Sequence, residues 1–164
     1  MKILITGKDG NVAKAIIPHL KSLGHEVLTY SKATEHDLEK DYTEIKHIEA
    51  DVYFLCADVK QYETILDFWN NNKKAKILVM GSRAYTNYQL QGKRKNKLYT
   101  YGLRKKHLDD LVRELQVNDT NHGKNSKLKI TIFNMGELSE CKNKLLQAIE
   151  LSLKEDNWHS FDFW

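Results

Sequence analysis

The chain has 164 residues, of which 41% are hydrophobic and 29% are charged, and its formal net charge is +4. These values are typical of one globular domain that can bury a core, and they are not those of a disordered chain. The charge is well below that of a dedicated nucleic-acid-binding domain.

The two cysteines, Cys56 and Cys141, lie far apart and have no paired His/Cys spacing around them. This pattern argues against a zinc site and against a disulfide framework, so we expect two buried thiols and no metal. The first apolar run is too short for a signal peptide, and no run approaches the ~20 residues of a membrane span. We therefore expect a soluble, cytoplasmic protein.

The N-terminal segment predicts a strand, a glycine turn and a helix, in that order. Residues 2–6 are apolar, Gly7 and Gly10 follow, and residues 10–23 have a helical apolar face. Pro18 should kink this helix without ending it, and Gly24 should end it. A turn of this kind brings backbone N–H groups and a positive helix end to one point, so we predict a phosphate-binding cradle.

The rest of the chain continues to alternate between strand and helix patterns. We expect strands at 25–30, 52–56, 76–80 and 128–133, helices at 42–50, 61–72, 98–117 and 141–153, polar connections at 31–40, 83–97 and 118–127, and short strands near Asp37-Leu38 and within 158–164. The core face of the helix at 98–117 should carry Leu103, His107 or Leu108, Leu111, Val112 and Leu115.

This alternation predicts an α/β fold: a doubly wound parallel sheet, Rossmann-like, in three α/β/α layers with six or seven strands. One NAD(P)-binding domain should span residues 1–164. Ligands of such sheets bind at the carboxyl ends of the strands, near the strand where the chain reverses direction across the sheet.

Four motifs carry a resemblance to a known family. They are Thr6-Gly7-x-x-Gly10-x-x-Ala13, Gly24-His25-Glu26-Val27, the segment Asp51 to Ala57, and Ser82 followed by Tyr101-x-x-x-Lys105. The chain resembles the short-chain dehydrogenase/reductases, nearest to their extended and atypical members, in a truncated form. The missing length falls after the strand at 128–133, Asn134-Met135-Gly136 stands in the place of a Pro-Gly turn, and Asn70 fits poorly as a fourth catalytic residue.

The resemblance implies that Ser82, Tyr101 and Lys105 are catalytic. Tyr101 and Lys105 are four residues apart and share one helix face, so the ammonium should lower the pKa of the phenol. Tyr101 would then be the general acid in carbonyl reduction, Lys105 would also hold the nicotinamide ribose, and Ser82 would polarise the substrate carbonyl. Tyr42-x-x-x-Lys46 has the same spacing in the wrong place. Tyr85, Tyr88 and Tyr99 are alternative donors.

The expected cofactor contacts come from the first strands and turns and from the helix at 98–117. The set comprises Thr6, Gly7, Lys8, Gly10, Asn11, Val12, Ser31, Lys32, Cys56, Ala57 and Lys105. NAD-binding proteins usually carry an acid at the end of the second strand, whereas Ser31 and Lys32 stand there in this chain. These two residues and Lys8 suit a 2′-phosphate, so we favour NADP over NAD.

The leading hypothesis is an NADP-dependent reductase of a carbonyl in a sugar or nucleotide-sugar, and the basic loop 93–97 would favour a phosphorylated substrate. The alternatives are a non-catalytic dinucleotide-binding sensor and nucleic-acid binding through the basic residues at 93–97 and 104–106. The resemblance also implies a homo-oligomer formed through helices 60–72 and 98–117. The aromatic tail at 158–164 is either an interface or packed on its own sheet.

Overall fold

A computed structural model describes residues 1–32, 37–71, 73–82, 96–121, 128–155 and 159–163 of the chain. Its elements in chain order are β1 (Lys2–Thr6), α1 (Asn11–Ser22), β2 (Glu26–Tyr30), the 3₁₀ helix η2 (Thr43–His47), β3 (Val52–Leu55), α2 (Gln61–Asn70), β4 (Ala75–Met80), α4 (Asn96–Asn121), β5 (Leu128–Asn134), α5 (Leu138–Lys154) and β6 (His159–Asp162).

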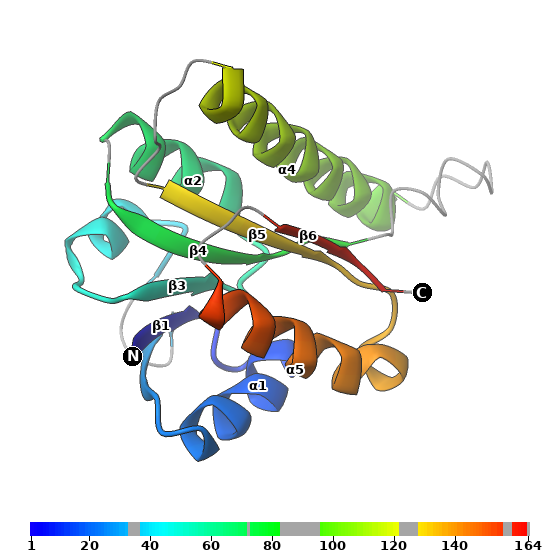
Figure 1. The fold of residues 1–164 in the computed structure, drawn as a ribbon. Coiled ribbons are helices and arrows are strands. Elements are labelled where there is room, and N and C mark those ends of the chain that lie inside the picture. The colour runs from blue at the N-terminus through cyan, green and yellow to red at the C-terminus, as the bar shows by residue number, and fades with distance from the viewer. Residues whose placement is uncertain (33–36, 72, 83–95, 122–127, 156–158, 164) are drawn as a thin grey trace.

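The strands form one sheet of six, all parallel, in the order β2-β1-β3-β4-β5-β6. Helices α1 and α5 cover one face of this sheet and α2 and α4 cover the other (Figure 1). The predicted three-layer, parallel α/β fold is therefore confirmed. The chain crosses from one side of β1 to the other between β2 and β3, so the carboxyl ends of β1 and β3 form the point where ligands of such sheets bind.

Each face of the sheet has its own hydrophobic core because successive strand residues point to opposite faces. In β3, Tyr53 and Leu55 belong to the core under α2 and α4, while Val52 and Phe54 belong to the core under α1 and α5. All residues of β3 are buried, which explains why its sequence is apolar throughout. Each large apolar side chain buried in this way contributes about 1.5–3 kcal/mol to folding.

The inner face of α4 carries polar as well as apolar side chains. Four of the predicted residues are buried: Leu108, Leu111, Val112 and Leu115. Of the two alternatives His107 and Leu108, His107 is therefore the exposed one. Leu103, which was also expected in the core, is 38% exposed. The prediction for Leu103 was wrong because Lys105 and Asp109 occupy part of the buried stripe, at 3% and 5% exposure. This polar stripe is the part of α4 that reaches the strand ends.

Several other boundaries differ from the sequence prediction. Residues 37–40 form a turn, with the Lys40 amide donating to the Asp37 carbonyl, so there is no strand at Asp37-Leu38. The helix expected at 42–50 is the short η2, and α4 extends through 118–121, where a connection was expected. Residues 83–95 of the expected loop and residues 122–127 of the expected connection lie outside the described residues.

The C-terminal strand β6 pairs with β5, which shows that the described part of the aromatic tail packs on its own sheet. Phe163 is 7% exposed, and the ring of Phe161 stacks on Phe133 with centroids 5.6 Å apart. Trp158 and Trp164 lie outside the described residues. In the described chain, none of the helices combines the length and the apolar character needed to cross a membrane.

Candidate functional site

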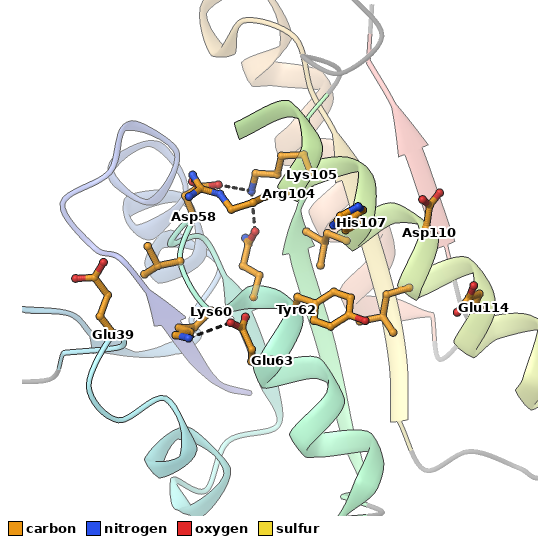
Figure 2. Close-up of a pocket in the computed structure, with 14 residues that line it drawn as sticks. Glu39, Asp58, Lys60, Tyr62, Glu63, Arg104, Lys105, His107, Asp110 and Glu114 are labelled. Carbon is orange, nitrogen blue, oxygen red and sulfur yellow. Dashed lines mark hydrogen bonds and ion pairs between the residues drawn. The ribbon is translucent and has the colours of Figure 1, made fainter. Parts of the chain in front are cut away.

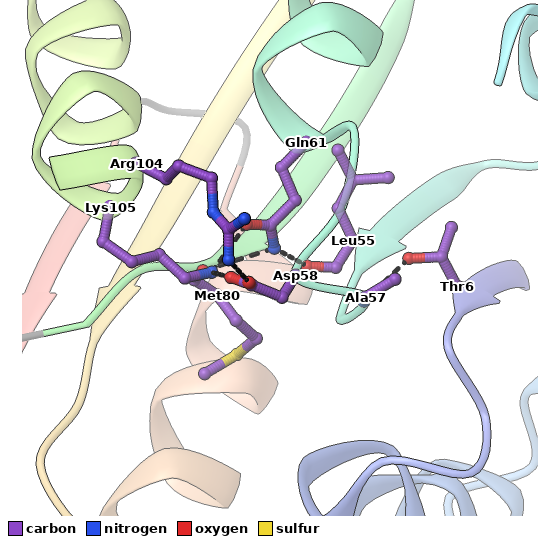
Figure 3. A network of polar contacts seen from close by, with 8 residues as sticks. All are labelled: Thr6, Leu55, Ala57, Asp58, Gln61, Met80, Arg104 and Lys105. Carbon is purple, nitrogen blue, oxygen red and sulfur yellow. Dashed lines mark hydrogen bonds and ion pairs between the residues drawn. The ribbon is translucent and has the colours of Figure 1, made fainter. Parts of the chain in front are cut away.

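The turn after β1 requires a glycine at position 7. Gly7 has a φ of +67°, and a Cβ placed on it would lie 2.9 Å from the Cα of Ala57. Two hydrogen bonds fix this turn: the Gly7 amide donates to the Tyr30 carbonyl and the Gly10 amide donates to the Gly7 carbonyl, both at 3.0 Å. The Ala57 amide also donates to Thr6 Oγ1 at 3.1 Å (Figure 3). The ends of β1, β2 and β3 therefore meet at Gly7.

A cavity of about 210 Å³ opens beside this turn. Its lining includes Gly7, Gly10, Ser31, Lys32, Asp37 and Ala57. Gly10 is the N-cap residue of α1 and makes no side-chain cap. The N-terminus of a helix attracts anions through its N–H groups and its dipole, so this cavity has the form of a phosphate cradle.

The remaining predicted cradle residues surround the turn without lining this cavity. Thr6 is 2% exposed, Asn11 opens α1, Val12 packs against the core under α1, and Lys8 is half-buried. Cys56 follows β3, and burial raises the pKa of its thiol far above the ordinary value. Cys56 and Cys141 are both free cysteines.

Lys32 is paired with carboxylates that the sequence interpretation did not include. Its Nζ lies 2.9 Å from Glu39 Oε2 and 3.6 Å from Asp37 Oδ2, and these partners raise its pKa. Asp37 and Asp9 both line the small cavity. The small cavity thus contains acids as well as Lys32, which the acid-free Ser31-Lys32 pair alone did not indicate.

Ser82, Tyr101 and Lys105 are brought together by α4 and the end of β4. The side chains of Tyr101 and Ser82 are hydrogen-bonded, and Lys105 Nζ lies 5.5 Å from the centroid of the Tyr101 ring. Ser82 follows β4 by two residues, and Tyr101 and Lys105 share one face of α4. The three residues that the resemblance implied therefore form one cluster.

The expected effect of Lys105 on Tyr101 was wrong. The pKa of Tyr101 is raised, chiefly by burial and also by the charge of Asp58, while the hydrogen bond from Ser82 and the charge of Arg104 lower it. The Lys105 ammonium lies over the ring face, and its hydrogen bonds go to other groups. Tyr101 is consequently a phenol near neutral pH.

Lys105 is held by a network that joins three elements (Figure 3). Its Nζ donates to Gln61 Oε1 at 2.7 Å and to the Met80 carbonyl at 2.8 Å, and it forms an ion pair with Asp58 Oδ1 at 3.1 Å. Arg104 holds the other oxygen of Asp58 at 2.6 Å. Burial lowers the pKa of Lys105, and the nearby Asp58 opposes this effect.

Gln61 anchors this network to the sheet. Its Nε2 donates to the Leu55 carbonyl at 2.6 Å and to the Met80 carbonyl at 3.3 Å. The sequence interpretation did not include Asp58 or Gln61 as site residues, and it named Arg104 only within the basic group at 104–106. Asp58 and Gln61 follow the carboxyl end of β3, and that position is the signal that could have identified them.

A second polar contact at the strand ends involves Asn134, the last residue of β5. Asn134 Nδ2 donates to Asp109 Oδ1 at 3.1 Å, and Arg113 Nε donates to Asp109 Oδ2 at 2.7 Å. A Cβ on Gly81 would lie 2.0 Å from Asn134 Oδ1, so only glycine fits beside Ser82. Asp109 thus connects α4 to the end of β5.

A larger cavity of about 610 Å³ lies between α2 and α4, and Lys105 and Arg104 stand at one end of it (Figure 2). Tyr62, Leu108 and Leu111 supply apolar lining, while Lys60 and Glu63 form an ion pair at 3.0 Å within it. Across the described ranges, no group of three or more His, Cys, Asp or Glu side chains could hold a metal ion.

No protein-family model and no curated protein sequence matches this chain. Solved structures do match it in fold. A short-chain dehydrogenase/reductase from Brucella ovis aligns with a TM-score of 0.64 and 12% identity, over 99% of this chain and 99% of its own. The 3-alpha-hydroxysteroid dehydrogenase from Pseudomonas sp. B-0831, complexed with NADH, aligns with a TM-score of 0.61 and 13% identity, over 99% and 95%.

A GDP-L-fucose synthetase from Naegleria fowleri, bound to NADP, aligns with a TM-score of 0.54 and 16% identity, over 80% of this chain and 49% of its own. Structural neighbours of the chain thus bind NADH or NADP, and the identities are low enough that the likeness is one of fold. The chain has the same parallel α/β fold as these dehydrogenases and reductases.

Proposed function

We propose that this protein binds a nicotinamide dinucleotide across the carboxyl ends of its strands and uses it to reduce a carbonyl group. The observation that carries the proposal is the cluster of Ser82, Tyr101 and Lys105 at the end of β4, on the same sheet edge as the glycine cradle after β1. A cradle for phosphate and a cluster for proton transfer along one edge are what a dinucleotide-dependent reductase requires.

The cradle fits a pyrophosphate. Gly7 leaves the space that a Cβ would fill, and the first turn of α1 begins at the uncapped Gly10. Backbone N–H groups at this helix end would bind the phosphate oxygens. Ala57 lines the same cavity, on the side expected to hold the adenosine.

The chemistry at the other end follows from the state of each side chain. A bound nicotinamide supplies the hydride, and the protein supplies the proton and the orientation. Tyr101, kept as a phenol by its raised pKa, would donate the proton to the carbonyl oxygen. Ser82, already hydrogen-bonded to Tyr101, would hold the same oxygen in place. Lys105 would bind a ribose hydroxyl.

We keep NADP as the proposed cofactor, with Ser31 and Lys32 binding the 2′-phosphate. On binding NADP, Lys32 would lose its ion pairs with Asp37 and Glu39 and pair with the 2′-phosphate instead. Because these pairs are lost, the preference for NADP over NAD should be modest. Lys32→Ala should weaken NADPH binding and leave NADH binding unchanged. Equal losses for both cofactors would show that Lys32 does not read the 2′-phosphate.

The substrate we propose is a carbonyl compound of the sugar or nucleotide-sugar class, acted on by a homo-oligomer. The experiment that tests the function is a fluorescence titration with NADPH and NADH, followed by turnover assays with a panel of carbonyl compounds. Tyr101→Phe should retain cofactor binding and lose turnover, because it removes only the hydroxyl. Unchanged turnover in Tyr101→Phe would reject the role of Tyr101, and failure to bind either cofactor would reject the proposal.

A non-catalytic dinucleotide sensor is the second candidate. It is favoured by the contacts of Lys105, since Gln61, the Met80 carbonyl and Asp58 all engage its ammonium. Such a protein would bind the cofactor and show no turnover with any carbonyl in the panel.

A further inference from the structure

The ammonium of Lys105 is bound unequally by its partners. Its hydrogen bonds to Gln61 Oε1 and the Met80 carbonyl are 2.7 and 2.8 Å long, and the ion pair with Asp58 Oδ1 is longer, at 3.1 Å. Asp58 Oδ1 is buried, and at 3.1 Å its ion pair is the longest of the three contacts of Lys105 Nζ. An ammonium has three N–H donors, and two are therefore committed to well-formed hydrogen bonds.

The three partners also differ in what they lose if Lys105 turns away. Gln61 is 5% exposed, and its oxygen would remain buried without a donor. The Asp58 side chain is 34% exposed, and its Oδ2 already accepts from Arg104 at 2.6 Å. Arg104 is itself 54% exposed and can follow the carboxylate. Asp58 is accordingly the partner that can leave at the lowest cost.

We propose that Asp58 is an exchangeable partner of Lys105: the bound dinucleotide takes over the third N–H of Lys105, and Arg104 retains the displaced Asp58 carboxylate. This inference rests on the proposed function, because the incoming group is a ribose hydroxyl of the cofactor. Gln61 and the Met80 carbonyl keep the ammonium in place throughout the exchange. Asp58 and Arg104 are thus positioning residues that set how readily Lys105 accepts the ligand.

The exchange predicts opposite effects for two substitutions. Asp58→Asn removes the competing charge, so NADPH and NADH should bind more tightly by about fivefold, equivalent to ~1 kcal/mol. Arg104→Gln leaves Asp58 with Lys105 as its main partner, so both cofactors should bind more weakly. In the double variant the Arg104→Gln effect should disappear, because Arg104 acts through Asp58. A penalty that persists there would mean that Arg104 contacts the ligand itself.

Asp110→Asn is the matched control. Asp110 lines the same large cavity and pairs with Lys106 at 2.5 Å, and its neutralisation changes the net charge by the same amount. Cofactor affinity should be unchanged in this variant. Equal gains in cofactor affinity in Asp58→Asn and Asp110→Asn would mean that the effect comes from net charge alone and would overturn the exchange. A weaker cofactor affinity in Asp58→Asn would also overturn it.

A second measurement needs no cofactor. Acetylation of Lys105 by acetic anhydride, followed by mass spectrometry of the dinucleotide-free protein, should be faster in Asp58→Asn than in wild type or Asp110→Asn. The reason is that Asp58 both shields the amine and favours its charged form. Equal rates would show that Asp58 does not restrain Lys105. If the rates differ as expected and no dinucleotide binds, the restraint stands and the proposed function fails. If dinucleotide binds and all affinities are equal, the function stands and the exchange fails.

Discussion

Tyr101, in the second turn of α4, hydrogen-bonds Ser82, which stands two residues beyond the end of β4. This contact joins a helix residue to a strand end that is 19 positions earlier in the chain. The same helix face reaches the end of β4 again through Lys105, which donates to the Met80 carbonyl at 2.8 Å. The packing of α4 on the sheet thus positions both the proposed proton donor, Tyr101, and the proposed carbonyl-binding group, Ser82.

The raised pKa of Tyr101 can be measured directly. The difference between wild type and Tyr101→Phe in absorbance at 295 nm reports the ionisation of this one phenol. Its midpoint should lie above 10, the ordinary value, because burial disfavours the phenolate. A midpoint below 10 would mean that the Lys105 ammonium dominates, as the sequence alone suggests.

The same shift has a consequence for stability. A group whose pKa is raised on folding contributes stability that is complete below the unfolded value and is lost as the pH rises through the folded value. Urea unfolding should therefore show that wild type loses stability relative to Tyr101→Phe above pH ~10 and not below pH ~9. A constant difference across this range would contradict the shift.

The sequence predicted β1, β3 and β4 well because each one is mainly an apolar run bounded by polar residues or glycine. β3 illustrates this, since burial on both faces leaves no other composition possible. It also predicted that Ser82, Tyr101 and Lys105 lie near one another. It did not predict the charge partners, because Asp58, Gln61 and Lys105 are brought together only when α2 and α4 pack against the same strand ends. Side-chain pairs between distant elements leave no periodic signal.

The cradle should not tolerate a methyl group at position 7. Gly7→Ala meets the backbone of Ala57 at 2.9 Å and adopts a φ of +67°, so we expect a loss of more than ~1–2 kcal/mol in unfolding free energy. Cofactor binding should be lost as well. Gly24→Ala is the control, since Gly24 has a φ of +79° and open space around it. That variant should lose stability in urea unfolding and keep its affinity for cofactor.

The contact between Asp109 and Asn134 should stabilise the helix on the sheet. Asp109→Ala removes the acceptor of a buried amide, and an unsatisfied group of this kind costs about 1–3 kcal/mol. Its neighbour Asp110 makes a half-exposed pair with Lys106, so Asp110→Ala should change the unfolding free energy by less than ~0.5–1 kcal/mol. Equal losses for the two variants would show that Asp109 does not anchor α4.

The C-terminal strand should contribute to the core under α1 and α5. Phe163 is 7% exposed, and its amide donates to the Asn134 carbonyl at 3.1 Å. Phe163→Ala should therefore lower the unfolding free energy by about 3 kcal/mol, the lower end of the range for a buried phenylalanine. Leu151→Ala is the control, because Leu151 is 44% exposed on α5. If Phe163→Ala were as stable as Leu151→Ala in urea unfolding, β6 would not be part of the core. A loss confined to Phe163→Ala would establish that the ring of the residue following β6 is part of the core under α1 and α5.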